Sequence, residues 1–279
     1  MFANLHDLMS TAADRRLCLP ALDIGGGQSD FLQGILAACE AARCPAVLLV
    51  WAPGATYLGL EACVDLVASF ARRASVPVVL HLDHGKDAQT VSHALELGFT
   101  SVMFDGSEHP LDENIRRTRA MAELAHARGA TIEGELGSFG QEQAAAAGDS
   151  HLADPAEAGR FVAETGVDLL APAVGNAHGF YKSPPRLRFE LIERIAAATG
   201  VPLSLHGGTG IPFADVRRAG ELGMRKINIA SQLHRDFSQA LQAAAVEGAG
   251  WHKVLRAGRE AIRQRAAEII HELGVEGLL

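Results

Sequence analysis

Short apolar runs alternate along the chain with longer segments in which apolar residues recur at helical spacing. Eight runs have the length and aliphatic composition typical of buried parallel strands. They cover residues 17–22, 46–51, 78–83, 100–104, 130–136, 168–174, 202–206 and 226–230. The segments between them, such as 111–128 and 187–199, predict helices, and glycine or proline stands at most helix-to-strand joints.

This alternation predicts an α/β fold with a parallel sheet. Eight strand–helix repeats in 279 residues are typical of a single (β/α)8 TIM barrel. An open, doubly wound sheet is the alternative, but the evenness and number of the repeats favour the barrel. No linker rich in proline, glycine or serine divides the chain, so we predict one domain over residues 1–279. The tail from residue 251 to 279 predicts a C-terminal helical extension that covers an oligomer interface or a neighbouring active site.

Composition narrows the class of protein. Apolar residues make up 48% of the chain and aromatic residues only 5%, so aliphatic side chains must fill the core. The net charge of −8 argues against nucleic acid as a partner. No stretch approaches the roughly 18 apolar residues of a membrane span, and the N-terminus lacks the apolar region of a signal peptide. Four cysteines without a CxxC pair (Cys18, Cys39, Cys44 and Cys63) predict buried reduced thiols. A cytoplasmic enzyme fits these features.

Candidate metal ligands stand at the ends of four predicted strands. These are Asp83 and His84, then Glu135, His178 and His206. The carboxyl ends of all strands in a barrel meet at one mouth, where active sites lie. Three imidazoles with an open fourth position are typical of a catalytic zinc ion. The sequence therefore predicts a metal site formed by His84, His178 and His206.

The other histidines receive different interpretations. We expect His81 to orient a neighbouring ligand rather than to bind metal. The remaining ones are interpreted as surface or local packing residues: His6, His93, His109, His126, His151, His234 and His271.

A second group of residues indicates anion binding. Gly207-Gly208-Thr209-Gly210 follows the seventh predicted strand, and Asn228-Ile229-Ala230-Ser231 lies at the end of the eighth. Glycines let backbone N–H groups approach a phosphate, and barrels often bind phosphate in these two loops. Ordinary turns are the alternative. A phosphate beside a metal would suit a phosphorylated hydroxyketone.

Several motifs carry a resemblance to a known family. They are Asp105-Gly106-Ser107, Glu113-Asn114-Ile115, the segments 133–137 and 165–168, and above all 175–181 and 206–212. Over about residues 78–232 the chain resembles the class II, zinc-dependent ketose-bisphosphate aldolases, such as the fructose- and tagatose-bisphosphate aldolases.

The resemblance implies roles for individual residues. His84, His178 and His206 match the zinc ligands, and Asp83 matches the catalytic acid/base. Glu135 matches a carboxylate near the metal that offers a second metal position. The positions that match the phosphate-binding set are Gly179, Gly207, Thr209, Asn228, Ala230 and Ser231. Glu142, in a loop one residue shorter than the family's usual pattern, would exchange the proton on the enediolate carbon; a solvated glutamate is the alternative.

The implied enzyme is a carbon–carbon lyase of carbohydrate metabolism. It would reversibly cleave a ketose 1-phosphate or 1,6-bisphosphate to dihydroxyacetone phosphate and an aldehyde through a metal-stabilised enediolate. The implied cofactors are one catalytic Zn²⁺ and, as an option, a monovalent cation. The implied partners are a sugar phosphate and further copies of the chain, as a homodimer or homotetramer.

Departures from the family concern the aldehyde half of the substrate. The segment 21–27, after the first predicted strand, lacks the asparagine that the family usually has there. After the second strand, Trp51-Ala52-Pro53 replaces the small or hydroxyl residues that help to hold the distal phosphate. In the tail, His252 stands where the family often has an arginine that reaches this phosphate from a neighbouring subunit, although Arg256 or Arg259 could replace that arginine. An aldehyde without the distal phosphate is therefore an alternative. A metal-dependent barrel hydrolase and a sugar-phosphate-binding protein without turnover are others. A Schiff-base aldolase is disfavoured because Lys226 begins a predicted strand instead of ending one.

Overall fold

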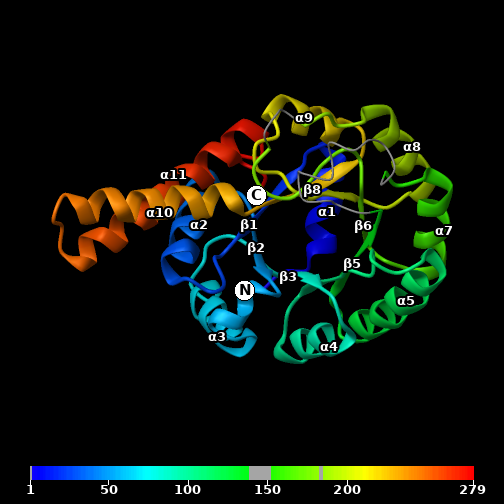
Figure 1. Ribbon diagram of the computed structural model, residues 1–279, viewed down its shortest axis with the longest axis horizontal. Coiled ribbons are helices and arrows are strands. Elements are labelled where there is room, and N and C mark those ends of the chain that lie inside the picture. Colours follow the sequence, from blue (N-terminus) through cyan, green and yellow to red (C-terminus); the bar gives the residue numbers. More distant parts are fainter. Residues whose placement is uncertain (1, 138–151, 182–184) are drawn as a thin grey trace.

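The computed structural model describes residues 2–137, 152–181 and 185–279, and its centre is a closed barrel (Figure 1). All neighbouring strands pair in parallel, and β1 pairs with β8 to close the barrel. The strands are β1 (Leu19–Asp23), β2 (Ala46–Trp51), β3 (Val78–Gly85), β4 (Ser101–Phe104), β5 (Thr131–Leu136), β6 (Leu169–Pro172), β7 (Leu203–Leu205) and β8 (Met224–Ile229). The predicted TIM barrel is confirmed.

Helices surround the barrel, and α10 and α11 form a hairpin that extends to one side of it (Figure 1). The helices are α1 (Leu5–Asp14), α2 (Ser29–Ala42), the short 3₁₀ helix η1 (Gly54–Tyr57), α3 (Leu60–Ala71), α4 (Ala88–Leu97), α5 (Leu111–Ala127), α7 (Pro155–Thr165), α8 (Phe189–Thr199), α9 (Phe213–Glu221), α10 (Ser231–Val246) and α11 (Trp251–Leu273). The long α11 packs on α2 and α10, as a C-terminal extension of the barrel.

The segment before α1 covers the amino-terminal end of the barrel. The backbone N–H of Ala3 donates to the carbonyl of Val78 at the start of β3. The side-chain amide of Asn4 donates to the carbonyl of Gly129, just before β5. Since this end is closed, the opposite end, where the strands finish, is the one open to ligands.

Several predicted strand boundaries were wrong by a few residues. β3 continues two residues further, to Gly85. β8 begins two residues earlier because Met224 pairs with Leu203 of β7. β7 begins after Pro202, which has no N–H to donate to a neighbouring strand.

The core is aliphatic, and the cysteines belong to it. Cys18, Cys39, Cys44 and Cys63 are free and buried, as predicted. Burial raises the pKa values of Cys18 and Cys44 to about 12, so these thiols stay protonated and unreactive. Within the described part of the chain, no helix combines the length and the apolar character needed to cross a bilayer.

Candidate active site

The end of β3 carries a backbone irregularity. The pairing of β3 with β4 shifts register between Leu82 and Gly85, and His84 has a left-handed backbone with a φ of 53°. Adjacent residues of a regular strand point to opposite faces of the sheet. The irregularity lets both Asp83 and His84 line one cavity of about 520 Å³ at the open end of the barrel. Left-handed residues other than glycine often mark functional sites.

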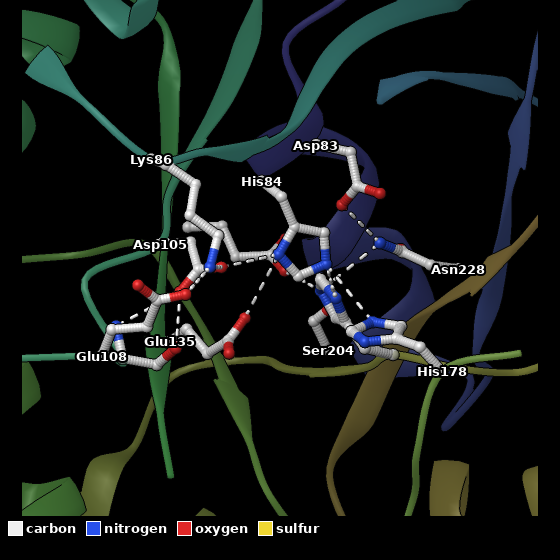
Figure 2. Close-up of polar contacts among 12 residues, drawn as sticks. Asp83, His84, Lys86, Asp105, Glu108, Glu135, His178, Ser204 and Asn228 are labelled. Carbon is white, nitrogen blue, oxygen red and sulfur yellow. Dashed lines mark hydrogen bonds and ion pairs between the residues drawn. The ribbon is translucent and has the colours of Figure 1, made fainter. Parts of the chain in front are cut away.

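Three imidazoles meet in this cavity. Nε2 of His84 lies 3.3 Å from Nε2 of His178 and 3.1 Å from Nδ1 of His206. Nitrogen atoms of all three rings lie within 4.8 Å of one another. His178 belongs to the loop after β6, and His206 directly follows β7. The three predicted ligands thus converge from separate strands, as Figure 2 shows for His84 and His178.

In two of these rings, the nitrogen that faces away from the other imidazoles (the outer nitrogen) is hydrogen-bonded to a buried carboxylate. Nδ1 of His84 lies 2.9 Å from Oδ2 of Asp105, and Nε2 of His206 lies 2.7 Å from Oε1 of Glu133. Each carboxylate accepts the proton of the nitrogen that faces it, so the inner nitrogen keeps its lone pair. Carboxylate–histidine pairs of this kind orient metal-binding imidazoles. The donor set therefore fits a divalent cation held between the rings.

The electrostatic field at the site also favours a cation. Burial lowers the pKa of His84, but the surrounding carboxylates, led by Asp83, outweigh burial and raise this pKa to about 9. Burial, with the neighbouring rings of His206 and His84, lowers the pKa of His178 to about 3. In the absence of a metal this field would place a positive charge on the His84 ring, so it also favours a metal cation at the same point. His178 stays neutral, and the neutral imidazole is the form that binds a metal.

Glu135 lies on the other side of His84. Its Oε2 is 3.6 Å from Nδ1 of His84, and this oxygen has no hydrogen-bond partner among the described residues. Burial and the nearby Asp105 raise the pKa of Glu135 to about 8. His84, Asp105 and Glu135 form a second group with metal-ligand spacing. The predicted second metal position therefore has a geometric basis, and its use stays a prediction.

Asp83 projects into the same cavity from β3. Its Oδ1 accepts a hydrogen bond of 2.9 Å from Nδ2 of Asn228 (Figure 2). Burial raises the pKa of Asp83, but the neighbouring cationic groups, led by His84, outweigh burial and lower it. The side chain is thus an ionised carboxylate that suits a general base. The buried Oδ1 of Asn228 has no partner among the described residues, so it can accept a hydrogen bond from a substrate hydroxyl.

The loops after β6, β7 and β8 form the end of the cavity that was predicted to bind phosphate. Ser231 is the first residue of α10, whose free N–H groups and dipole favour an anion. Oγ1 of Thr209 accepts a hydrogen bond of 3.3 Å from the backbone N–H of Gln232. All six predicted positions line the cavity: Gly179, Gly207, Thr209, Asn228, Ala230 and Ser231.

Close packing between two loops fixes the backbone at this end. Gly207 has a φ of 65°, and a Cβ at this position would lie 1.9 Å from the carbonyl oxygen of Ala177. The hydroxyl of Tyr181 accepts from the N–H of Ala177 and lies within hydrogen-bond distance of the carbonyls of Ala177 and Gly207. Only glycine permits this approach, so the loops that carry His178 and Thr209 are held together.

A buried polar network beneath the imidazoles was missed by the sequence analysis. Lys226 does not begin β8; it is the third residue of the strand and is fully buried. Its Nζ lies 2.9 Å from Oε2 of Glu133 and 3.2 Å from Oγ of Ser204. Nε2 of His81 lies 3.8 Å from Oε2 of Glu133, the carboxylate that contacts His206, and the predicted orienting role of His81 stays a prediction. Lys226 precedes Asn228 by two residues, and this spacing on a strand indicates a shared face.

Replacement of Lys226 by methionine should destabilise the protein strongly. Burial alone would raise the pKa of Glu133, but Lys226 and His206 outweigh it and hold this pKa well below its ordinary value. Without Lys226 the carboxylate loses its main counter-ion, and the free energy of unfolding should fall by about 3–5 kcal/mol. Urea denaturation followed by circular dichroism measures this change.

Two further variants test the interpretation of this ion pair. In the double variant Lys226→Met/Glu133→Gln much of the lost stability should return, since no buried charge is left alone. Arg160→Met is the matched control, because it breaks only exposed pairs, with Glu164 and Asp112, and should change stability little. Equal losses in the single and double variants would contradict the proposed coupling.

One histidine has a different environment from the one predicted. His234 was predicted to be a surface or packing residue, but it lines the cavity, and its Nε2 lies 2.8 Å from Oδ1 of Asp23. No local sequence pattern indicates this pair, because the two residues are 211 positions apart. Glu142 lies outside the described residues.

A (β/α)8 barrel with convergent imidazoles at its open end defines the class of metal-dependent barrel enzymes. Comparison with known proteins gives the family. The family model for class II fructose-bisphosphate aldolase matches residues 3–278. The fructose-bisphosphate aldolase of Geobacillus stearothermophilus is 39% identical over 255 residues, with 89% of each chain covered. The probable fructose-bisphosphate aldolase of Bacillus subtilis is 37% identical over 97% of each chain.

A solved structure agrees with these relatives. The crystal structure of the YdjI aldolase from Escherichia coli K12 superposes with a TM-score of 0.90 at 32% identity, covering 99% of both chains. The chain belongs to the class II fructose-bisphosphate aldolase family, and it is an aldolase, a carbon–carbon lyase that acts on sugar phosphates. The predicted family and type of reaction are confirmed.

Proposed function

We propose that this protein is a zinc-dependent aldolase that reversibly cleaves a ketose phosphate to dihydroxyacetone phosphate and an aldehyde. The observation that carries the proposal is the donor set of His84, His178 and His206. Their nitrogens converge within 4.8 Å, and carboxylates hold the outer nitrogens of two rings. Three imidazoles are typical of catalytic zinc sites.

The residues around the metal position have separate tasks in this proposal. A zinc ion held there would act as a Lewis acid that stabilises negative charge on the substrate oxygens. Asp83 would take the proton from the C4 hydroxyl during cleavage and return it during condensation. Its low pKa and its hydrogen bond from Asn228 support this role, because they keep the carboxylate ionised and oriented.

The phosphate of the substrate would bind at the start of α10. The first turn of this helix, the hydroxyls of Thr209 and Ser231, and the backbone at Gly207 face the cavity there. A phosphate at this end would place the reacting carbons toward the imidazoles. Both ends of the dihydroxyacetone phosphate half would thus be held in the same cavity.

We further propose that the protein is a cytoplasmic homodimer or homotetramer. The tip of the α10–α11 hairpin exposes large apolar side chains: Val246 is 84% exposed and Trp251 is 76% exposed. Neighbouring apolar residues exposed on a projecting hairpin support contact with another copy of the chain. The buried, free thiols support a reducing compartment.

Product analysis tests the proposed reaction. The zinc-loaded protein, incubated with ketose 1-phosphates and 1,6-bisphosphates, should release dihydroxyacetone phosphate and an aldehyde in equal amounts. A coupled assay with glycerol-3-phosphate dehydrogenase measures the first product, and a carbonyl reagent measures the second. Release of inorganic phosphate without an aldehyde would favour the metal-dependent hydrolase instead, and binding without products would favour a sugar-phosphate-binding protein.

A further inference from the structure

A further part of the cavity, here called its second end, is lined by residues of β1, β2 and α10. Asp23 lies at the last position of β1, Trp51 at the last position of β2, and His234 in the first turn of α10. All three line the cavity together with the catalytic candidates. Because β1 pairs with β8, this second end adjoins the predicted phosphate positions at the end of β8, and it extends from them to the end of β2. The aldehyde half of the substrate would occupy it.

The carboxylate of Asp23 is fixed in place at this end. Its Oδ1 accepts a hydrogen bond of 2.6 Å from the N–H of Gly25 and faces Nε2 of His234 at 2.8 Å. The side chain of Asp23 is only 3% exposed. A buried carboxylate held in this way is a preformed hydrogen-bond acceptor in the cavity wall.

Two basic residues that could bind a second phosphate, Lys86 and Arg259, are already paired with carboxylates. Lys86 is the only lysine or arginine among the described residues that line the cavity. Its Nζ lies 2.6 Å from Glu108 and 3.3 Å from Asp105 (Figure 2). Arg259, which could have replaced the family's usual arginine, is paired with Asp30 of α2 at 2.8 Å.

The balance of charge therefore opposes a distal phosphate. Besides Glu135, four carboxylates line the cavity: Asp23, Asp83, Asp105 and Glu108. A phosphate monoester carries between one and two negative charges at neutral pH and is normally bound by arginine or lysine. Trp51, which is 47% exposed, adds an apolar surface to the same cavity. An apolar ring face and a carboxylate acceptor suit the C–H and O–H groups of a neutral sugar chain.

We propose that Asp23, His234 and Trp51 form a subsite that selects aldehydes with an uncharged, hydroxylated distal end. The preferred substrates are then ketose 1-phosphates, whereas the names of the relatives state a bisphosphate. The inference rests on the proposed aldolase function, because it assigns the second end of the same cavity.

Substrate competition tests the subsite without any variant. The kcat/KM of the zinc-loaded protein should be about tenfold or more higher for fructose or tagatose 1-phosphate than for the 1,6-bisphosphates, since one unfavourable charge contact contributes a kilocalorie or more. A preference for the bisphosphates would overturn the inference while leaving the aldolase function intact. Absence of dihydroxyacetone phosphate from every substrate would overturn the proposed function and this inference with it.

A single substitution tests whether Asp23 causes the preference for ketose 1-phosphates. Asp23→Asn removes the charge but keeps the shape and an acceptor oxygen, so it should shift the ratio of kcat/KM values toward the bisphosphates by about tenfold, mainly through KM. Glu61→Gln is the matched control, because Glu61 also pairs with a histidine, His93, at 2.9 Å but lies outside the cavity. The control should leave the ratio unchanged. A ratio in Asp23→Asn within twofold of the unsubstituted protein would overturn the role of Asp23.

Discussion

Removal of metal with a chelator is expected to abolish cleavage, and Zn²⁺ is expected to restore it. His84, His178 and His206 present nitrogen lone pairs to one point, and carboxylates fix the orientation of two of the rings. Without a divalent cation no Lewis acid stabilises negative charge on the substrate oxygens, so kcat should fall by about 10³-fold or more. Release of dihydroxyacetone phosphate, measured beside metal content, tests this.

A ligand variant and a control distinguish loss of metal from general damage. His178→Ala should lose both zinc and activity, because one of three imidazoles is missing. His93→Ala should keep both, since His93 is a partly exposed residue paired with Glu61. Full activity in protein that contains no metal would exclude the zinc-dependent mechanism.

The barrel and the three imidazoles could be predicted because they depend on local patterns. Aliphatic runs such as those of β2 and β3 are buried along their length, and their composition identifies them as strands. Once eight such strands are assumed, topology brings their carboxyl ends together. The convergence of His84, His178 and His206 then follows without any knowledge of side-chain contacts.

The rest of the site depends on contacts that no local pattern contains. The register shift after Leu82 turns His84 toward the cavity, and such an irregularity has no clear sequence signal here. Glu133 and Lys226 lie 93 positions apart, and only the closed barrel brings them to 2.9 Å. Asp23 and His234 form a pair for the same reason. The convergence of the strand ends was predictable, with boundaries correct to within a few residues, whereas the pairings across the interior were not.

Replacement of Asp83 by asparagine should lower kcat by about 10²–10⁴-fold, the range typical of a lost general base. Burial alone would favour the neutral acid, but the cationic groups around Asp83, His84 first, lower its pKa and keep it ionised. Asparagine keeps the acceptor for Asn228 but cannot take a proton. Steady-state kinetics with a ketose phosphate substrate measure the change.

Metal content decides whether this loss comes from the missing proton acceptor. Asp83 adjoins His84, so a structural role would lower zinc content and kcat together, whereas a general base would lower kcat alone. Asp87→Asn is a suitable control, because Asp87 caps the exposed start of α4 and asparagine caps helices equally well. A fall in kcat of less than tenfold in Asp83→Asn, or a parallel loss of zinc, would contradict the assigned role. Intact zinc with a large loss of kcat would separate proton transfer by Asp83 from metal binding by its neighbour.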